Sequence, residues 1–156
     1  LFKGCEVVRL LTGERECLDP LKGEAPVGWI VTGYPWYGIQ TTEHQAFLKA
    51  YKERFNDHPR LGSVVGYTAI HSLAAGLRKA GGSDTEKLIA AFKGLEVTSP
   101  FGPIRYRPED HQSTMGAFVG RTRLQNGVGA MSDFRYLDGA RFQPPAEEVR
   151  KLRAAD

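Results

Sequence analysis

The apolar and polar positions near the start of the chain follow a strand pattern. Residues 5–11, CEVVRLL, and residues 27–33, VGWIVTG, are short apolar runs rich in β-branched side chains, and each predicts a buried strand. A short helix is predicted between them, around Cys17 to Lys22. The second strand, which we expect in a parallel sheet buried on both faces, leads into the aromatic loop YPWYG at residues 34–38.

Residues 42–95 then carry the helical period and predict three helices in succession. Capping boxes and glycines mark their limits. The predicted limits are a Thr42–Gln45 capping box and Asn56 for the first helix, Ser63 and Gly81 for the second, and a Ser83–Glu86 capping box and Gly94 for the third.

The second helix, residues 63–80, carries apolar side chains over a wide face, and this predicts that the face is buried. The apolar positions are Val64, Val65, Tyr67, Ile70, Leu73, Ala74 and Leu77. The polar positions, predicted to point the other way, are Ser63, Thr68, His71, Ser72 and Arg78.

After Glu96 the period changes to two, which predicts strands again. Residues 102–107 and 115–123 are predicted to form a hairpin whose charged turn holds His111, and residues 130–137 a further strand. The tail, PPAEEVRKLR, predicts a short helix that ends at Arg153. Strands and helices in this order predict an α/β protein.

Composition narrows the class of protein. The 156 residues are 41% apolar and 25% charged, which is typical of a folded chain with a core. The net charge of +3 is spread along the chain and argues against nucleic acid as a partner. No apolar run reaches the roughly 18 residues of a membrane span. The chain begins at Leu1 without an initiator Met or signal peptide, which indicates a mature product or a fragment.

Cysteine and histidine chemistry suggests no catalytic or metal site. Cys5 and Cys17 have no partner histidines in a metal-ligand pattern, and we favour free thiols over the disulfide that an oxidising compartment permits. Asp110 and His111 are adjacent, so they point in different directions, and no nucleophile elbow surrounds Ser113. His44, His58 and His71 are interpreted as surface residues of helices. We therefore expect no catalytic residue, metal or cofactor.

Several short motifs are each weak evidence alone, but their order along the chain is specific. They are GWIVTGYPWYG (28–38), an F-x-x-x-Y helix that ends in NDHP (47–59), GYTAI (66–70), AGG (80–82), SDTEKLIAA (83–91), GL (94–95), SPFGP (99–103) and DHQ (110–112). In this order, from about Val7 onward, the chain resembles the C-terminal part of the branched-chain amino acid type of ABC-transporter substrate-binding protein.

The resemblance implies an incomplete type I periplasmic binding-protein fold, with pieces of two three-layer α/β lobes. It assigns residues 1–33 to the second lobe, 34–38 to a crossover, 39–124 to the first lobe, and 125–156 to a return to the second lobe. It also implies a periplasmic solute-binding component that delivers an amino acid, or a related carboxylate, amide or aromatic acid, to a membrane permease. A ligand-sensing module of a regulator or receptor is the alternative, and an enzyme is less favoured.

The same resemblance suggests ligand-binding positions. Leu11 or Thr12 stands where amino-acid-binding relatives place an acid for the ligand's amino group, and Glu14 reaches that place only if the loop shifts. Leu61 and Gly62 stand where many relatives have an aromatic side chain over the ligand. The missing acid and the missing aromatic side chain both argue against an amino-acid ligand.

The aromatic side chains of the crossover are further candidates. Tyr34 and Tyr37 could equally form part of a pocket wall or pack in the core, whereas we expect Trp36 to pack in the core. Most of the first lobe is absent from the sequence, so we expect the helix at 63–80 to expose an apolar face. Pairing or element swapping between two copies is the outcome we favour.

Overall fold

The computed structural model describes residues 2 and 4–152, so Leu1 and the predicted helix end at Arg153 lie outside the described residues. The strands are β1 (Val8–Arg9), β2 (Ile30–Gly33), β3 (Glu96–Ser99), β4 (Gly102–Arg105), β5 (Ala117–Gln125) and β6 (Val128–Leu137). The helices are α1 (Arg15–Leu18), α2 (Thr42–Phe55), α3 (Leu61–Ala80), α4 (Thr85–Phe92) and α5 (Ala146–Leu152), with short 3-10 turns η1 (Lys22–Glu24) and η2 (Gly139–Arg141). No described helix combines the length and the apolar character that crossing a membrane requires.

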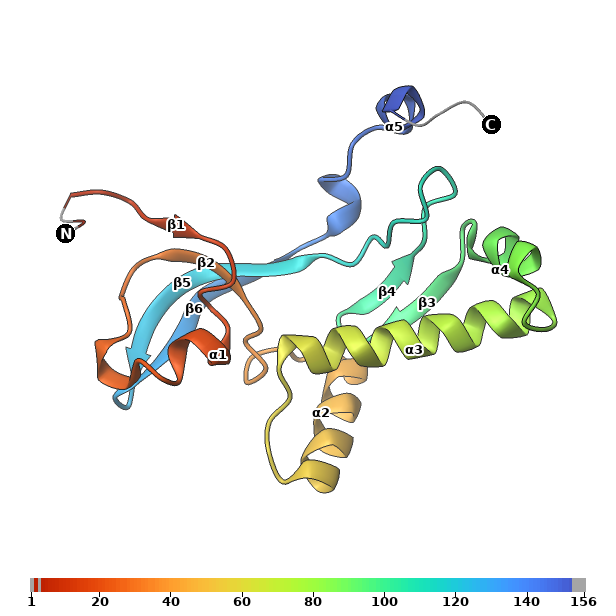
Figure 1. Cartoon of the computed structure of the whole chain (residues 1–156). Coiled ribbons are helices and arrows are strands. Elements are labelled where there is room, and N and C mark those ends of the chain that lie inside the picture. The colour runs from red at the N-terminus through yellow and green to blue at the C-terminus, as the bar shows by residue number, and fades with distance from the viewer. Residues whose placement is uncertain (1, 3, 153–156) are drawn as a thin grey trace.

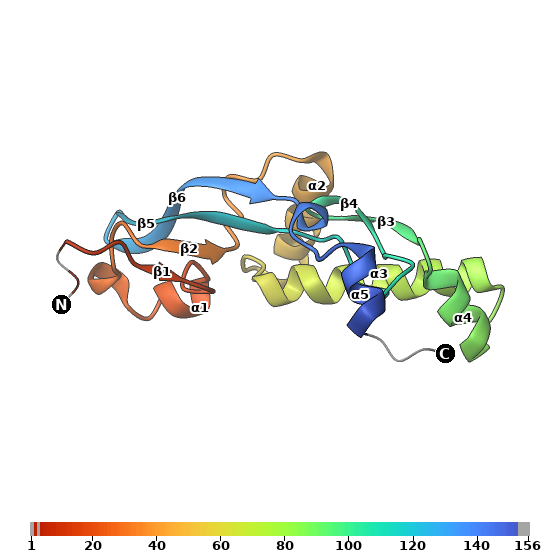
Figure 2. The same ribbon diagram turned by 90° about the horizontal axis from the view of Figure 1, so that it is seen from above.

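The elements form two groups that lie side by side (Figure 1). One group, here called the strand lobe, holds a four-stranded sheet in the order β1-β2-β5-β6, with α1 beside it. The other, the helical lobe, holds the β3-β4 pair with α2, α3 and α4. Seen from above, the two lobes give an elongated molecule, with α3 extending along the helical lobe (Figure 2). The predicted α/β class is confirmed.

The strand lobe differs from the prediction at its edge. Only Val8 and Arg9 of the predicted strand 5–11 are in β1, and most of that run is exposed because β1 is an edge strand with one described neighbour. The predicted burial of this run is wrong. The sheet is also mixed, since β2 is parallel to β1 and antiparallel to β5.

The predicted hairpin forms only next to its turn, where Tyr106 and Ser113 make an antiparallel bridge and the Arg107 N–H donates to the Gln112 carbonyl (2.9 Å). The longer strands on either side pair elsewhere. β4 pairs with β3, whereas β5 pairs with β2 and β6. A tight turn sets the observed hairpin: the Ser99 hydroxyl donates to the Gly102 carbonyl (2.8 Å) and accepts from the Phe101 N–H (3.1 Å). His111 does lie in a turn, as predicted, with a left-handed backbone (φ 58°) and its N–H donating to the Arg107 carbonyl.

The helix limits follow local chemistry, shifted by one or two residues. Thr41, one residue before the predicted cap, accepts the His44 N–H at the start of α2. Asp84, one residue after the predicted cap, accepts the Lys87 N–H at the start of α4. α3 begins at Leu61 and ends, as predicted, at Gly81, whose left-handed backbone (φ 72°) suits glycine.

The buried face of α3 includes Val64, as predicted, but its other members differ from the prediction, because Thr68 and Ser72 were predicted to point outward and are buried. A stripe of small side chains faces the lobe, made of Val64, Thr68, Ser72 and Gly76. This stripe allows close packing, because a Cβ at Gly76 would lie 2.5 Å from the Phe92 ring. The apolar side chains of Val65, Tyr67, Ile70 and Leu73 are 41–67% exposed, and the described residues leave this face uncovered.

The main core lies where the two lobes meet. It contains Tyr34, Ile39, Phe47, Val64, Phe101 and Phe118. These residues come from the crossover, α2, α3, the β3–β4 turn and β5, so one cluster joins both lobes. Full burial of each large apolar side chain contributes about 1.5–3 kcal/mol to stability, so the junction is a firmly packed region.

Candidate ligand-binding site between the two lobes

The loop after β1 is held against the end of β2. The Gly13 N–H donates to the Thr32 carbonyl (3.0 Å), and the Leu11 N–H donates to the Thr32 hydroxyl (2.9 Å). Gly13 and Gly33 are in close contact, since a Cβ at Gly33 would lie 2.5 Å from the Gly13 backbone. Two glycines are therefore needed for the loop to lie this close to the strand, and the close approach places Glu14 at the junction of the lobes.

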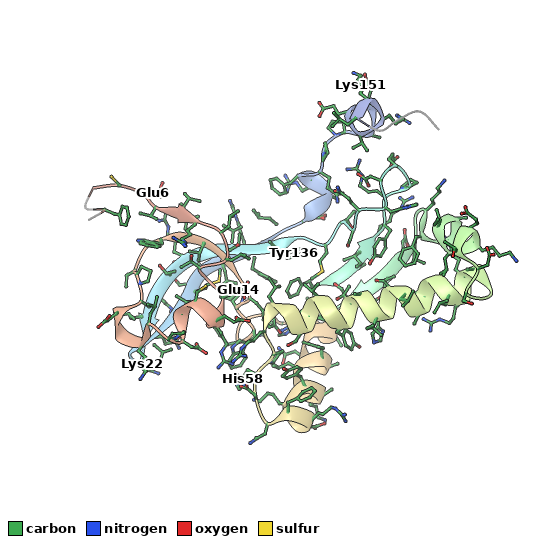
Figure 3. All side chains as sticks on the ribbon, viewed as in Figure 1. Glu6, Glu14, Lys22, His58, Tyr136 and Lys151 are labelled. Atoms are coloured by element: carbon green, nitrogen blue, oxygen red, sulfur yellow. The ribbon has the colours of Figure 1, made fainter. Side chains whose placement is uncertain are left out.

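Glu14 is the residue before α1, yet its carboxyl makes no capping bond to that helix. The side chain is only 7% exposed, and its Oε1 is buried without a hydrogen-bond partner among the described residues. Burial, which is the largest cause, and the charge of Glu16 together raise the pKa of Glu14 to about 7, and a hydrogen bond from the Tyr34 backbone N–H opposes the rise. Figure 3 shows Glu14 between the two lobes, near the first turn of α3.

A cavity of about 250 Å³ lies at this junction. Its lining is Leu11 and Glu14 from the loop, Thr32 and Gly33 from β2, Leu61 and Val65 from α3, Phe101, and residues 115–118 at the start of β5. Glu14 is the one ionisable side chain in this described lining. The volume is slightly below the roughly 300–1,000 Å³ of sites for drug-sized ligands, and the lining is largely apolar, as in such sites.

Behind the cavity lies a buried polar pair. The Tyr34 hydroxyl lies 2.6 Å from His44 Nε2, and His44 Nδ1 lies 3.2 Å from the Ile39 carbonyl. The carbonyl can only accept, so Nδ1 carries the proton, and burial lowers the pKa of His44 and keeps the ring neutral. Tyr34 therefore donates to Nε2. His44 is fully buried, so its interpretation as a surface residue is wrong.

The other two crossover aromatics lie elsewhere. The Tyr37 hydroxyl donates to the Met131 carbonyl (2.8 Å) and accepts from the Met131 N–H (2.7 Å). Trp36 contacts His58 edge to face. Both line a second groove of about 760 Å³, which also includes Arg15 and shares no lining residue with the Glu14 cavity.

Residues 2–127 match the family described as periplasmic binding protein. The chain belongs to this family. The similarity predicted from the ordered motifs is thus confirmed.

Solved and curated relatives agree with that assignment. One is the crystal structure of an ABC-type branched-chain amino acid transporter from Rhodopseudomonas palustris, which is 26% identical with a TM-score of 0.75 and is matched over 92% of this chain and 38% of its own. Another is a solute binding protein of an ABC transporter from Rhodopseudomonas palustris, in complex with 3,4-dihydroxy benzoic acid. It is 28% identical with a TM-score of 0.66, and the match covers 87% of this chain and 38% of that protein. The Leu/Ile/Val-binding protein homolog 6 of Brucella abortus is 26% identical over 103 residues.

This periplasmic binding protein chain spans only part of its relatives. The match to the Brucella protein covers 64% of this chain and 26% of that protein. The two solved structures are each covered over 38% of their length. The fold is accordingly part of a type I periplasmic binding-protein fold, as the sequence predicted.

Within this binding-protein chain, three of the residues predicted for the site line the Glu14 cavity. Leu11, Glu14 and Leu61 all contribute to its lining, although the sequence indicated that Glu14 would reach the site only if the loop shifted. Thr12 is buried beside them, and Gly62 follows Leu61 on the exposed side of α3.

The three crossover aromatics do not join that cavity in this periplasmic binding protein. Tyr34 is 3% exposed and belongs to the core, while Trp36 and Tyr37 line the second groove. Sequence reasoning missed Val65, Phe101, Met115 and Phe118, which complete the apolar wall. Their apolar character was visible, but only the packing of α3 and β5 shows that they converge.

Proposed function

We propose that this chain is part of the solute-binding component of an ABC importer and that a small organic solute occupies the cavity at the junction of the lobes. The observation that carries the proposal is a largely apolar cavity between the two lobes whose described lining holds one acid, Glu14, and one hydroxyl, Thr32. A concave, mostly apolar lining with a few polar groups is typical of sites that bind small organic molecules.

The lining supports binding in preference to turnover. Its described side chains include one acid and one hydroxyl, and the Thr32 hydroxyl already accepts the Leu11 N–H. A hydrolytic site needs a nucleophile beside a general base, and this lining supplies no such pair. We assign solute contact to Leu11, Glu14 and Leu61, with Thr12 and Gly62 as their neighbours in the chain.

The wider role is proposed from the family. A binding protein of this kind works in the periplasm and delivers its solute to a membrane permease. Candidate solutes are amino acids, amides and aromatic acids, and a relative in complex with 3,4-dihydroxy benzoic acid supports the last class. For the lobe boundaries, we place residues 117–137 with the second lobe, because residues 118–121 of β5 pair with β2 and β6 pairs with β5.

A thermal-shift screen of the full-length protein against these three classes of compound tests the function. A compound that binds only the folded protein raises the melting temperature, and we expect one class to do so. Leu61→Trp fills the cavity and should abolish that shift, whereas Leu21→Trp, at an exposed position outside the cavity, should retain it. Equal shifts in both variants, or no shift with any compound, would contradict the proposal.

A further inference from the structure

The second groove, of about 760 Å³, lies between surfaces of the two lobes that the Glu14 cavity does not use. Arg15 and Asp19 of α1 and the tip of the β5–β6 hairpin line it from the strand lobe, and residues 56–58, the loop between α2 and α3, line it from the helical lobe. Its described lining holds two arginines and two aspartates, so it offers no net charge that would attract a charged ligand. The contacts that cross this groove are therefore of more interest than its volume.

The crossover beside the groove is fixed to the strand lobe. The Tyr37 hydroxyl donates to the carbonyl of Met131 and accepts from its N–H, which pairs both backbone groups of a residue on the edge strand β6. Gly38 packs so closely against the Phe134 ring that no Cβ fits there. Trp36, the residue before Tyr37, therefore belongs with the strand lobe.

Two contacts join this strand-lobe side of the groove to the loop between α2 and α3. Trp36 packs edge to face against the His58 ring. Arg15 Nη1 lies 3.5 Å from Asp57 Oδ1, and Figure 3 shows the labelled His58 on the same loop. Among the residues that the structure describes, Arg15–Asp57 is the one ion pair that joins the two lobes.

The two partners of this ion pair are positioned from within their own lobes. Arg15 Nε donates to Asp19 on the same helix (2.9 Å), and Asp57 Oδ1 accepts the His58 N–H (2.7 Å). Arg15 Nη1 is buried and has no hydrogen-bond partner among the described residues, so Asp57 supplies its compensating charge. A movement that separates α1 from the loop loses this attraction, and the pair therefore favours the lobe orientation observed here.

The same two segments contribute to the Glu14 cavity. Glu14 directly precedes Arg15 and lines the cavity from the strand lobe, and Leu61 follows Asp57 by four residues and lines it from the helical lobe. Pro59, between Asp57 and Leu61, is fully buried and restricts the backbone of that short connection. A lining supplied by two lobes exists only while their orientation is kept, so the ion pair and the cavity depend on the same arrangement.

We propose that Arg15 and Asp57 form an interlobe latch, in which their ion pair, with the Trp36–His58 contact beside it, stabilises the lobe orientation that forms the Glu14 cavity. Neither Arg15 nor Asp57 lines the cavity, so both are positioning residues that act by setting the population of this orientation. The latch goes beyond the proposed function, because it concerns the protein without any solute.

Single-molecule FRET on the full-length protein without solute measures that population. One dye is attached at Glu24→Cys, in the turn beside β6 of the strand lobe, and the other at Glu86→Cys, in α4 of the helical lobe. Both positions are exposed. The native cysteines, Cys5 and Cys17 among them, are replaced by serine so that only these two positions react.

The decisive variant is Asp57→Asn, which removes the charge and keeps an oxygen to accept the His58 N–H. The side chains of the pair are 29% and 52% exposed, so solvent screens part of the attraction. We expect the ratio of the observed orientation to all others to fall about two- to fivefold. Arg15→Gln should give a shift in the same direction. Asp57→Asn should then have no further effect in the Arg15→Gln protein, because the two residues act through one contact.

The matched control is Glu53→Gln. Glu53 is an exposed acid four residues before Asp57, and its ion-pair partner, Lys49, lies in the same helix. This variant should leave the FRET distribution unchanged.

Three results would overturn the latch: an Asp57→Asn distribution identical to that of the parent, an equal shift in Glu53→Gln, or additive shifts when the Arg15 and Asp57 variants are combined. The thermal-shift screen tests the proposed function separately, since these FRET measurements contain no solute.

Discussion

Replacing Glu14 by glutamine should make stability depend on pH in a defined way. Burial raises the pKa of Glu14 from 4.5 to about 7 in the folded protein. Between these values the folded protein holds a proton that the unfolded chain releases, so the native carboxyl lowers stability as pH rises. This contribution is favourable in full below about pH 4.5, declines through the interval, and is lost above about pH 7.

The magnitude follows from the same two values. Each unit of pKa difference corresponds to about 1.4 kcal/mol, so ionising Glu14 lowers the free energy of unfolding by about 3–4 kcal/mol at alkaline pH. Glutamine has the same shape, accepts the Tyr34 N–H and cannot ionise. We therefore expect Glu14→Gln to match the parent at about pH 4.5 and to be about 3–4 kcal/mol more stable at about pH 8.

Urea unfolding of the full-length protein without solute, followed by circular dichroism at several pH values, measures this difference. Glu24→Gln removes an exposed acid that does not act on the Glu14 pKa and is the control, with an expected change within about 0.5 kcal/mol at each pH. If Glu14→Gln and the parent show the same stability at every pH, or if the variant is the less stable one at about pH 8, the carboxyl is not buried as described here.

Three further predictions follow from other parts of the structure. Tyr34→Phe leaves the buried His44 Nε2 without its donor and should lower the free energy of unfolding by about 1–3 kcal/mol, measured by thermal denaturation; an unchanged melting temperature would contradict the pairing. The isolated 156-residue polypeptide should pair or self-associate through the exposed apolar face of α3, and a 17.3 kDa monomer in light scattering, with no binding of hydrophobic dye, would refute this. Cys5 and Cys17 are exposed and free, so both thiols should react before reduction, and a titration that finds them only after reduction would show a disulfide.

Local signals along the sequence were sufficient for the helices and for one turn. Asn56 and Gly81 adopt left-handed backbones where the first two predicted helices end, because these residues tolerate that conformation. The glycine-marked gap between the last two strands became the Asn126–Gly127 turn, with positive φ at both residues, as a two-residue hairpin requires. The N-caps of α2 and α4 are shifted by one residue from the predicted positions. In each case the neighbouring side chain, Thr41 beside Thr42 and Asp84 beside Ser83, can also accept the capping hydrogen bond.

The pairing of strands and the buried face of a helix could not be predicted from local sequence signals. An alternating run such as residues 102–105 fits any partner strand, and only the Ser99 turn and the position of β2 decided that β4 pairs with β3. Apart from Val64, the apolar pattern of α3 did not predict which side chains are buried, because the small side chains at Thr68, Ser72 and Gly76 allow a closer approach to β3 and α4 than the larger apolar ones do.

Residue types and their order were enough to predict the α/β class of this protein and its family, and they indicated Leu11, Glu14 and Leu61 as site candidates. Only the packing of separate segments decided which residues meet at the cavity. Glu14 enters the cavity because Gly13 and Gly33 allow the loop to approach β2, while Tyr34 moves into the core because His44, ten residues away, accepts its hydroxyl. These are contacts between separate segments, and their free energy depends on distance and burial, which no local pattern of residues encodes.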